Sequence, residues 1–356
     1  MTRKTLALLL TAPVAALALD GISFEHGDWQ LVCDNTGTCR AAGGKDGAQD
    51  AKGGNGPGTA VLLTRQAGAN AAVTAEIAIY TPEGQNTPQS LTLYHEHGKE
   101  KVQAAGKVAL QAGEDDLTTG TLDAAQTQTL LTALRGKDDR ITLRDGSSDA
   151  VWTISGEAEA AVLLKMDDFQ QRVGTPSALI QPGKENKAVL EAQAKPVIHP
   201  APVASGEPQT LKINDAAHAA LWQKLVVQGK SSCAQQDDAA KADITLYPLN
   251  DAHRLAAIDC DGEIAAPYGT RKLFAVVSPD LKTVEALPGN PDWNDGYENG
   301  VIYATDPGSM AACKEEQRYI WDGNAFQRFY EASTGTCKAF TVGFWEMPIF
   351  VSELKQ

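Results

Sequence analysis

Two histidines are the residues of this chain that most resemble metal ligands. His95 and His97 are two positions apart in a run of β-forming residues, so on a strand both side chains lie on the same face. Two imidazoles at this spacing could chelate a transition metal if a carboxylate from elsewhere in the chain completed the site. The alternative is an exposed pair at the end of a strand, without a metal.

Other polar clusters suggest structural roles. The turn at 292–298 is rich in oxygen ligands, but Gly296 comes one position too early for a calcium loop of the EF-hand type, so we expect a solvated turn. Asp167, Asp168 and Arg172 are expected on or beside the polar face of a helix, where an i, i+4 ion pair explains them. The sequence has no G-x-S-x-G or H-E-x-x-H motif, so we predict no catalytic residue and no cofactor.

The six cysteines form three pairs of neighbours in the sequence. We predict the disulfides Cys33–Cys39, Cys233–Cys260 and Cys313–Cys337. Six cysteines allow about 15 connectivities, but pairing of neighbours closes the shortest loops and keeps each bridge within one domain. Five residues separate the first pair, instead of the two of a redox motif or a zinc knuckle, so we expect these bridges to be structural.

The first 18 residues have the pattern of a secretory signal peptide. Arg3 and Lys4 precede an apolar run from Leu6 to Leu17, and the stretch ends in the small residue Ala18. We therefore expect export to the periplasm of a Gram-negative cell, where disulfides form. No later apolar run is long enough to cross a membrane, so we expect a soluble mature protein.

The chain is acidic, with a formal net charge of -14. This charge repels nucleic acid and anionic lipid and attracts cationic partners at long range. We therefore expect neither nucleic-acid binding nor a membrane span after signal cleavage, and we expect a monomer.

The length suits two domains joined by a connector. Residues 182–209 contain five prolines among Ala, Lys and Glu, which is typical of a semi-extended linker. We predict an N-terminal β-rich domain with two helices at 19–181 and a C-terminal β-rich domain with one leading helix at 210–356. The predicted fold class is α+β, mostly β, with local disulfides.

In the N-terminal domain, short β-forming runs are bounded by turn residues. Strands are predicted at 29–33, 60–65, 73–80, 91–97, 140–143 and 151–154. The glycine-rich stretch 43–58 is expected to be a mobile loop. One helix should begin after the N-cap Asp123, and another should span 157–172 and end at Gly174.

The C-terminal domain should contain one helix carrying Leu221, Trp222 and Leu225, followed by strands. Strands are predicted at 244–247, 254–260, 272–277, 301–304 and 318–321. The clearest local signal is the segment 321–326, WDGNAF, which is typical of a hairpin turn between aromatic strands.

Two motifs carry a resemblance to a known family. They are FxxGDWxxxCDNxGxCxAxG from Phe24 to Gly43 and SGxxxAAxLxxMDDxQxRVGTPxAL from Ser155 to Leu179. With Trp321 and Cys337 they resemble an uncharacterised proteobacterial periplasmic family that is known only as a domain of unknown function. The first motif is also similar to the invasion-associated locus B proteins. The resemblance implies the compartment, the fold and the disulfides, and it implies no activity.

The sequence therefore predicts a protein that works by binding and not by turnover. The expected target is an envelope protein or a cationic secreted factor, and inhibition of a cell-wall-degrading enzyme is one form this could take. The competing hypothesis is an envelope hydrolase of peptidoglycan or glycan, in which two carboxylates from different loops act as general acid and base.

Overall fold

The structure is a computed structural model. It describes residues 19–47, 56–81, 86–98, 101–112, 117–136, 138–146, 149–228, 242–260, 271–290, 293–306, 314–335 and 345–356. The predicted signal peptide lies outside these residues, as do Cys233, Cys313 and Cys337.

The N-terminal half is built on a seven-stranded antiparallel sheet, sheet A, in the order β1-β2-β3-β4-β5-β9-β8. Its strands are β1 (Ile22–His26), β2 (Trp29–Cys33), β3 (Cys39–Gly47), β4 (Gly56–Arg65), β5 (Val73–Tyr80), β8 (Gln111–Ala112) and β9 (Leu117–Leu122). The strands predicted at 29–33, 60–65 and 73–80 are confirmed. The predicted Cys33–Cys39 disulfide is also present, and it joins directly opposed residues of β2 and β3.

The prediction of a loop over 43–58 is wrong at both ends of that stretch, because β3 runs to Gly47 and β4 begins at Gly56. A Cβ atom at Gly43 would lie 2.2 Å from the Trp29 ring, which crosses β3 at this point. Glycine is therefore used here for close approach of an indole and not for chain flexibility.

A second, four-stranded sheet, sheet B, has the order β11-β10-β6-β7. Its strands are β6 (Ser90–His97), β7 (Lys101–Ala109), β10 (Asp139–Arg144) and β11 (Trp152–Ile154). Two helices, α1 (Ala124–Ala133) and α2 (Glu159–Phe169), complete this half. The predicted N-cap Asp123 is present and forms a capping box with Gln126, and Gly174 has the left-handed φ of +81° expected after α2.

One hydrophobic core joins these elements. It lies between one face of sheet A, sheet B and the two helices, and Trp29, Trp152, Val162 and Met166 are at most 1% exposed within it. The buried side of α2 therefore belongs to the core.

The C-terminal half stacks a helix on two five-stranded antiparallel sheets. Sheet C contains β13 (Gln209–Leu211), β14 (Ile244–Pro248), β15 (Arg254–Asp259), β16 (Lys272–Val277) and β17 (Val284–Ala286). Sheet D contains β18 (Asn294–Glu298), β19 (Val301–Asp306), β20 (Glu315–Trp321), β21 (Phe326–Ser333) and β22 (Met347–Val351). The helix α3 (Ala216–Gln228) contributes Leu221 and Leu225 to a core on one face of sheet C, and the other face packs against sheet D.

The predicted hairpin at 321–326 is confirmed, because Trp321 pairs with Phe326 across a turn in which Gly323 has a φ of +100°. Cys260 is disulfide-bonded as well, to a partner outside the described residues. Taken together, the described residues confirm the predicted mostly β fold with a few helices.

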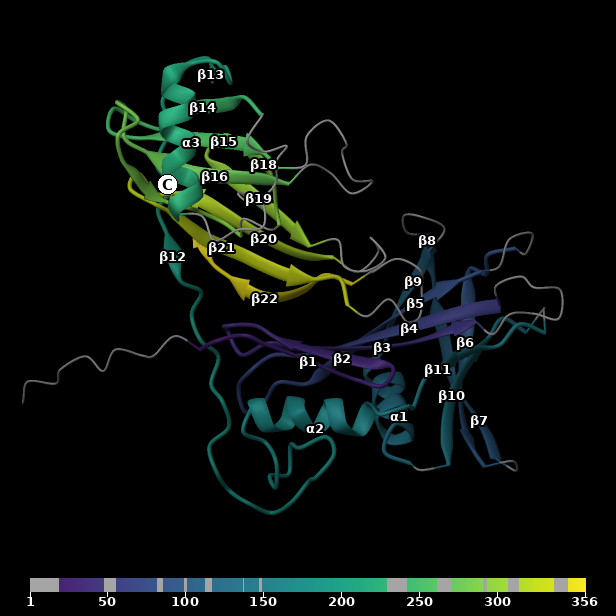
Figure 1. Cartoon of the computed structure of the whole chain (residues 1–356). Helices are drawn as coiled ribbons and strands as arrows, with labels where there is room; N and C mark the ends of the chain where they lie inside the picture. Colours follow the sequence, from purple (N-terminus) through teal and green to yellow (C-terminus); the bar gives the residue numbers. More distant parts are fainter. Residues whose placement is uncertain are drawn as a thin grey trace, which may run out of the picture.

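The two halves contact each other through the second face of sheet A. Trp345, Met347 and Ile349 pack there against side chains that include Val32 and Leu62. Figure 1 shows β21 and β22 on the side of sheet A opposite α2. Sheet A is therefore covered on both faces.

The Pro-rich segment 182–209 is extended and docks along both halves. The backbone of Leu190 forms hydrogen bonds with the backbones of Gln170 and Gly68. The short strand β12 (Val197–Ile198) pairs in parallel with β23 (Glu353–Leu354). The division into two domains with independent stability stays a prediction. No helix in the described stretches is long and apolar enough to cross a membrane.

Candidate functional site

The structure brings the two predicted histidines together with a carboxylate. His95 and His97 lie on the same face of β6, with side chains 21% and 66% exposed, and Asp139 lies on the neighbouring strand β10, directly opposite His97. Asp139 Oδ2 is 3.0 Å from His95 Nε2, and its Oδ1 is hydrogen-bonded to His97 Nδ1. The hydrogen bond from His97 and the contact with His95 outweigh the desolvation of Asp139 and lower its pKa.

This arrangement supplies the carboxylate that a metal site would need, but the three groups contact one another directly. In the described part of the chain, no group of three or more His, Cys, Asp or Glu side chains is arranged to hold a metal ion. A metal at His95 and His97 would have to displace Asp139 from its hydrogen bond with His97 and its contact with His95. The metal role of the pair stays a prediction.

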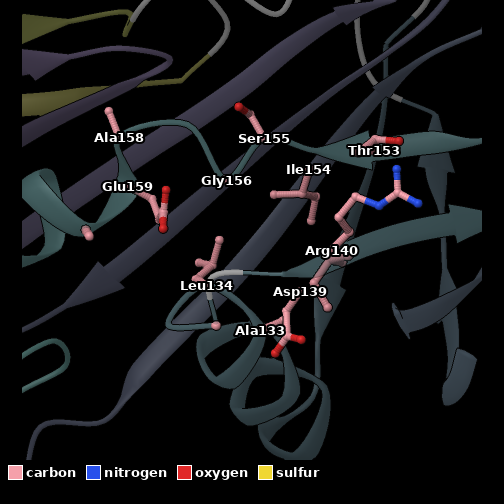
Figure 2. A pocket seen from close by; sticks show the side chains of 13 residues that line it. Ala133, Leu134, Asp139, Arg140, Thr153, Ile154, Ser155, Gly156, Ala158 and Glu159 are labelled. Carbon is pink, nitrogen blue, oxygen red and sulfur yellow. The ribbon is translucent and has the colours of Figure 1, made fainter. Parts of the chain in front are cut away.

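Asp139 also lines a cavity of about 430 Å³, which Figure 2 shows at close range. The cavity lies where the end of α1, the strands β10 and β11 and the start of α2 meet. Its volume is in the range of small-ligand pockets. Its charged side chains are Asp139, Arg140 and Glu159.

Most polar groups of this cavity are occupied by internal partners. Arg140 donates to Glu96 at 3.0 Å, and Figure 2 shows its side chain beside Thr153. The hydroxyl of Ser155 donates to Asp28 at 2.5 Å, and the Ser155 carbonyl accepts from the indole of Trp29. The polar wall of the cavity is therefore held in place before any ligand enters.

Glu159 differs from these groups. Its side chain is half-buried at the first position of α2, and among the described residues it has no cationic partner. Desolvation by burial raises its pKa, although the backbone N–H groups of Glu159 and Ala160 oppose the shift. Burial therefore destabilises the charged form of Glu159, and a cation bound beside it would offset this loss of hydration.

Beside the cavity, a carboxylate is shared by two guanidinium groups on the outer face of sheet B. Glu96, only 5% exposed, accepts hydrogen bonds from Arg140, Thr142 and Arg144. Desolvation raises its pKa, but the bond from Thr142 and the charges of Arg144 and Arg140 prevail and lower it. Glu96 therefore anchors the arginine that borders the cavity.

The family of the chain follows from its similarity to known proteins. The family model described as "Protein of unknown function (DUF1176)" matches residues 23–352. The chain belongs to this family. It is 24% identical over 338 residues to the uncharacterized protein YpfG of Escherichia coli (strain K12), and the alignment covers 87% of each chain. No solved structure matches the chain. The predicted membership of a family of unknown function is confirmed, whereas the likeness to the locus B proteins and the periplasmic location stay predictions.

In this DUF1176 protein, the polar residues of the motif at 155–179 have a structural role. The expectation that Asp167 and Arg172 lie on or beside a polar helix face is wrong, because they are 0% and 1% exposed. Asp167 accepts from Arg65 at 2.7 Å and from the backbone of Leu179 at 2.6 Å. Arg172 donates to Ser177 at 2.9 Å and bonds the Gly68 carbonyl. The network fixes the chain after α2 against sheet A.

The oxygen-rich turn is also built differently from the expected solvated loop. Asn294 is fully buried, accepts from the backbone of Asn290 at 3.0 Å and donates to the Pro288 carbonyl. Asp292 lies outside the described residues.

Sequence reasoning found the two histidines and missed Asp139 and Glu159. Asp139 is distant from the pair in sequence, and only the register of β6 and β10 places it opposite His97. Glu159 carries one recognisable signal, an acidic residue in the first turn of a helix, but this feature is common and does not mark a cavity.

Proposed function

We propose that this protein is a periplasmic interaction protein that binds a cationic partner protein, and that the Glu159 cavity receives a lysine or arginine side chain of that partner. The observation that carries the proposal is the Glu159 carboxylate, which lines the cavity half-buried and forms no ion pair among the described residues, while Arg140 of the same cavity is paired with Glu96. The acidic net charge of -14 supports the same kind of partner.

The proposal favours binding over turnover because the other polar groups of the cavity are already committed. Both oxygens of Asp139 contact imidazoles, and Ser155 is bonded to Asp28 and has no histidine partner among its described bonds. A binding site benefits from such fixed groups, whereas a nucleophile or general base needs a free site for the proton that it moves.

The test compares two substitutions of the same kind two residues apart. Glu159→Gln removes the cavity carboxylate, and the control Glu157→Gln removes an exposed carboxylate that does not line the cavity. Each variant is used to capture crosslinked partners from periplasmic extract, and its binding to lysozyme, a cationic cell-wall-degrading enzyme, is measured by calorimetry.

We expect E159Q to bind the partner at least about tenfold more weakly, as for the loss of one close charge pair, and E157Q to bind as the wild type does. Binding of the wild type should also weaken with added salt. Equal recovery of the partner by both variants would refute the role of Glu159, and no specific partner under gentle crosslinking would refute the function.

A second candidate function, an envelope hydrolase, is favoured by one observation. Asp139 and Glu159 line the same cavity, and their pKa values are shifted in opposite directions, as in a carboxylate base and a carboxylic acid. In this case the wild type releases soluble fragments from peptidoglycan sacculi, and both E159Q and Asp139→Asn abolish the release. No release by the wild type excludes this candidate.

A further inference from the structure

A second cavity, of about 490 Å³, lies on the outer face of sheet D. Its lining comes from β19, β20 and β21 and from the segment leading into β22. Arg318 and Tyr330 are paired across adjacent strands on this face, while Tyr319 and Trp321 of β20 pack on the opposite side, against sheet C. The cavity therefore lies on the side of sheet D away from the core that this sheet shares with sheet C, and it is separate from the Glu159 cavity.

Arg318 is held in place on the wall of this cavity. Its guanidinium lies 4.8 Å from the centroid of the Tyr330 ring, and its Nε donates to Glu316. The Tyr330 hydroxyl donates in turn to Glu346. Burial and the bond to Glu346 raise the pKa of Tyr330, so this hydroxyl keeps its proton and the contact persists. An arginine fixed in this way loses little side-chain freedom when it binds a ligand.

Donors and acceptors remain available in the cavity. Within the described residues, the terminal nitrogens of Arg318 and the ammonium of Lys314 have no hydrogen-bond or ion-pair partner. The carboxylates of Glu316 and Glu346 each have one internal donor, and each can accept further hydrogen bonds.

These groups together suit a ligand that carries both an anionic group and hydroxyl groups. A carboxylate or phosphate satisfies the guanidinium fork and the ammonium. Hydroxyl groups satisfy the remaining oxygens of the two glutamates. Ala332 and Trp345 add an apolar edge to the cavity; they are 5% and 8% exposed, and Trp345 also packs against sheet A.

We propose that this cavity binds an acidic sugar, with its carboxylate or phosphate on Arg318 and Lys314 and its hydroxyl groups on Glu316 and Glu346. The volume is sufficient for a ligand of this size. The proposal goes beyond the binding of a cationic protein and does not depend on Glu159.

The test uses three sugars that differ in charge: glucuronate, glucose 6-phosphate and glucose. Titration calorimetry of the full chain should show at least one of the two acids binding at least about tenfold more tightly than glucose. The tighter of the two acids identifies the anionic group that the cavity prefers. If neither acid binds more tightly than glucose, the proposal is overturned.

The chain provides a matched control for the arginine. Arg328 also stacks on an aromatic ring, at 4.7 Å from Phe350, and pairs with a glutamate, Glu331, but it does not line the cavity. We expect Arg318→Gln to weaken binding of the acid at least about tenfold and Arg328→Gln to leave it unchanged. An equal loss in both variants overturns the proposal. If R318Q does not fold, Lys314→Gln decides: weaker binding supports the proposal, and unchanged binding overturns it.

Discussion

The buried network around Asp167 allows a sharp test of what holds the N-terminal half together. Asp167→Asn keeps the shape of the side chain but removes the charge that faces two buried arginines, Arg65 and Arg172, each 1% exposed. Burial lowers the pKa of Arg65 in spite of the hydrogen bond to Asp167. Without Asp167, the buried charge of Arg65 would therefore destabilise the folded state. Breaking a buried pair in this way costs about 3 to 5 kcal/mol.

The neighbouring residue is the control. Asp168 is exposed and pairs with Lys165 on the same helix at 2.9 Å, so Asp168→Asn should cost about 0.5 kcal/mol or less. Urea unfolding of the oxidised protein, followed by fluorescence of the buried Trp29 and Trp152, measures both variants. With an m value of about 3 kcal/mol/M, D167N should lower the midpoint by about 1 M or more. Equal midpoints for D167N and D168N would refute the reasoning.

Three further predictions concern the connector, acid stability and the disulfide. Trypsin should cut first after Lys187, because residues 186–189 make no backbone hydrogen bonds in the described structure. The two fragments should still co-elute on gel filtration, since the contact on sheet A holds them together, and Met347→Ala should separate them by weakening that contact. The pKa of Glu96 is lower in the folded protein than in the unfolded chain, where it is about 4.3, so the Glu96 carboxylate stabilises the fold at pH values above the unfolded pKa. This stabilisation is lost as the pH falls through the pKa of the folded state. Glu96→Gln should therefore make the free energy of unfolding depend less steeply on pH in acid. Replacing Cys33 and Cys39 by alanine should lower the free energy of unfolding by about 2 kcal/mol, measured in urea; an unchanged midpoint would contradict this.

Local signals in the sequence were sufficient for most of the fold. The capping box at Asp123, the turn at Gly323 and the short loop between Cys33 and Cys39 each depend on residues close together in the chain, and each is present. The loop predicted over 43–58 failed because Gly43 accommodates Trp29 of a neighbouring strand, which is a tertiary reason for a glycine.

Most of the candidate site could not be predicted from the sequence, again because its contacts depend on tertiary structure. The spacing of His95 and His97 put both on one face of a strand, but their contact with Asp139 depends on strand register. Likewise, Asp167 and Arg172 are polar residues that a helical pattern assigns to solvent. Asp167 is buried with Arg65 of β4 as its partner, and Arg172 is buried with Ser177 and the Gly68 carbonyl as its acceptors. A single sequence does not reveal partners that are brought together by sheet topology.

The contact between sheet A and β22 has a consequence for the order in which the chain can mature. Sheet A is complete by β9, yet its second face is covered by Trp345, Met347 and Ile349, which are synthesised more than two hundred residues later. The same applies to β12, whose parallel partner β23 follows it by more than 150 residues. A nascent chain therefore carries an open apolar sheet face until residues 345–349 have been released, and a chain stopped shortly before residue 345 would keep this aggregation-prone face exposed.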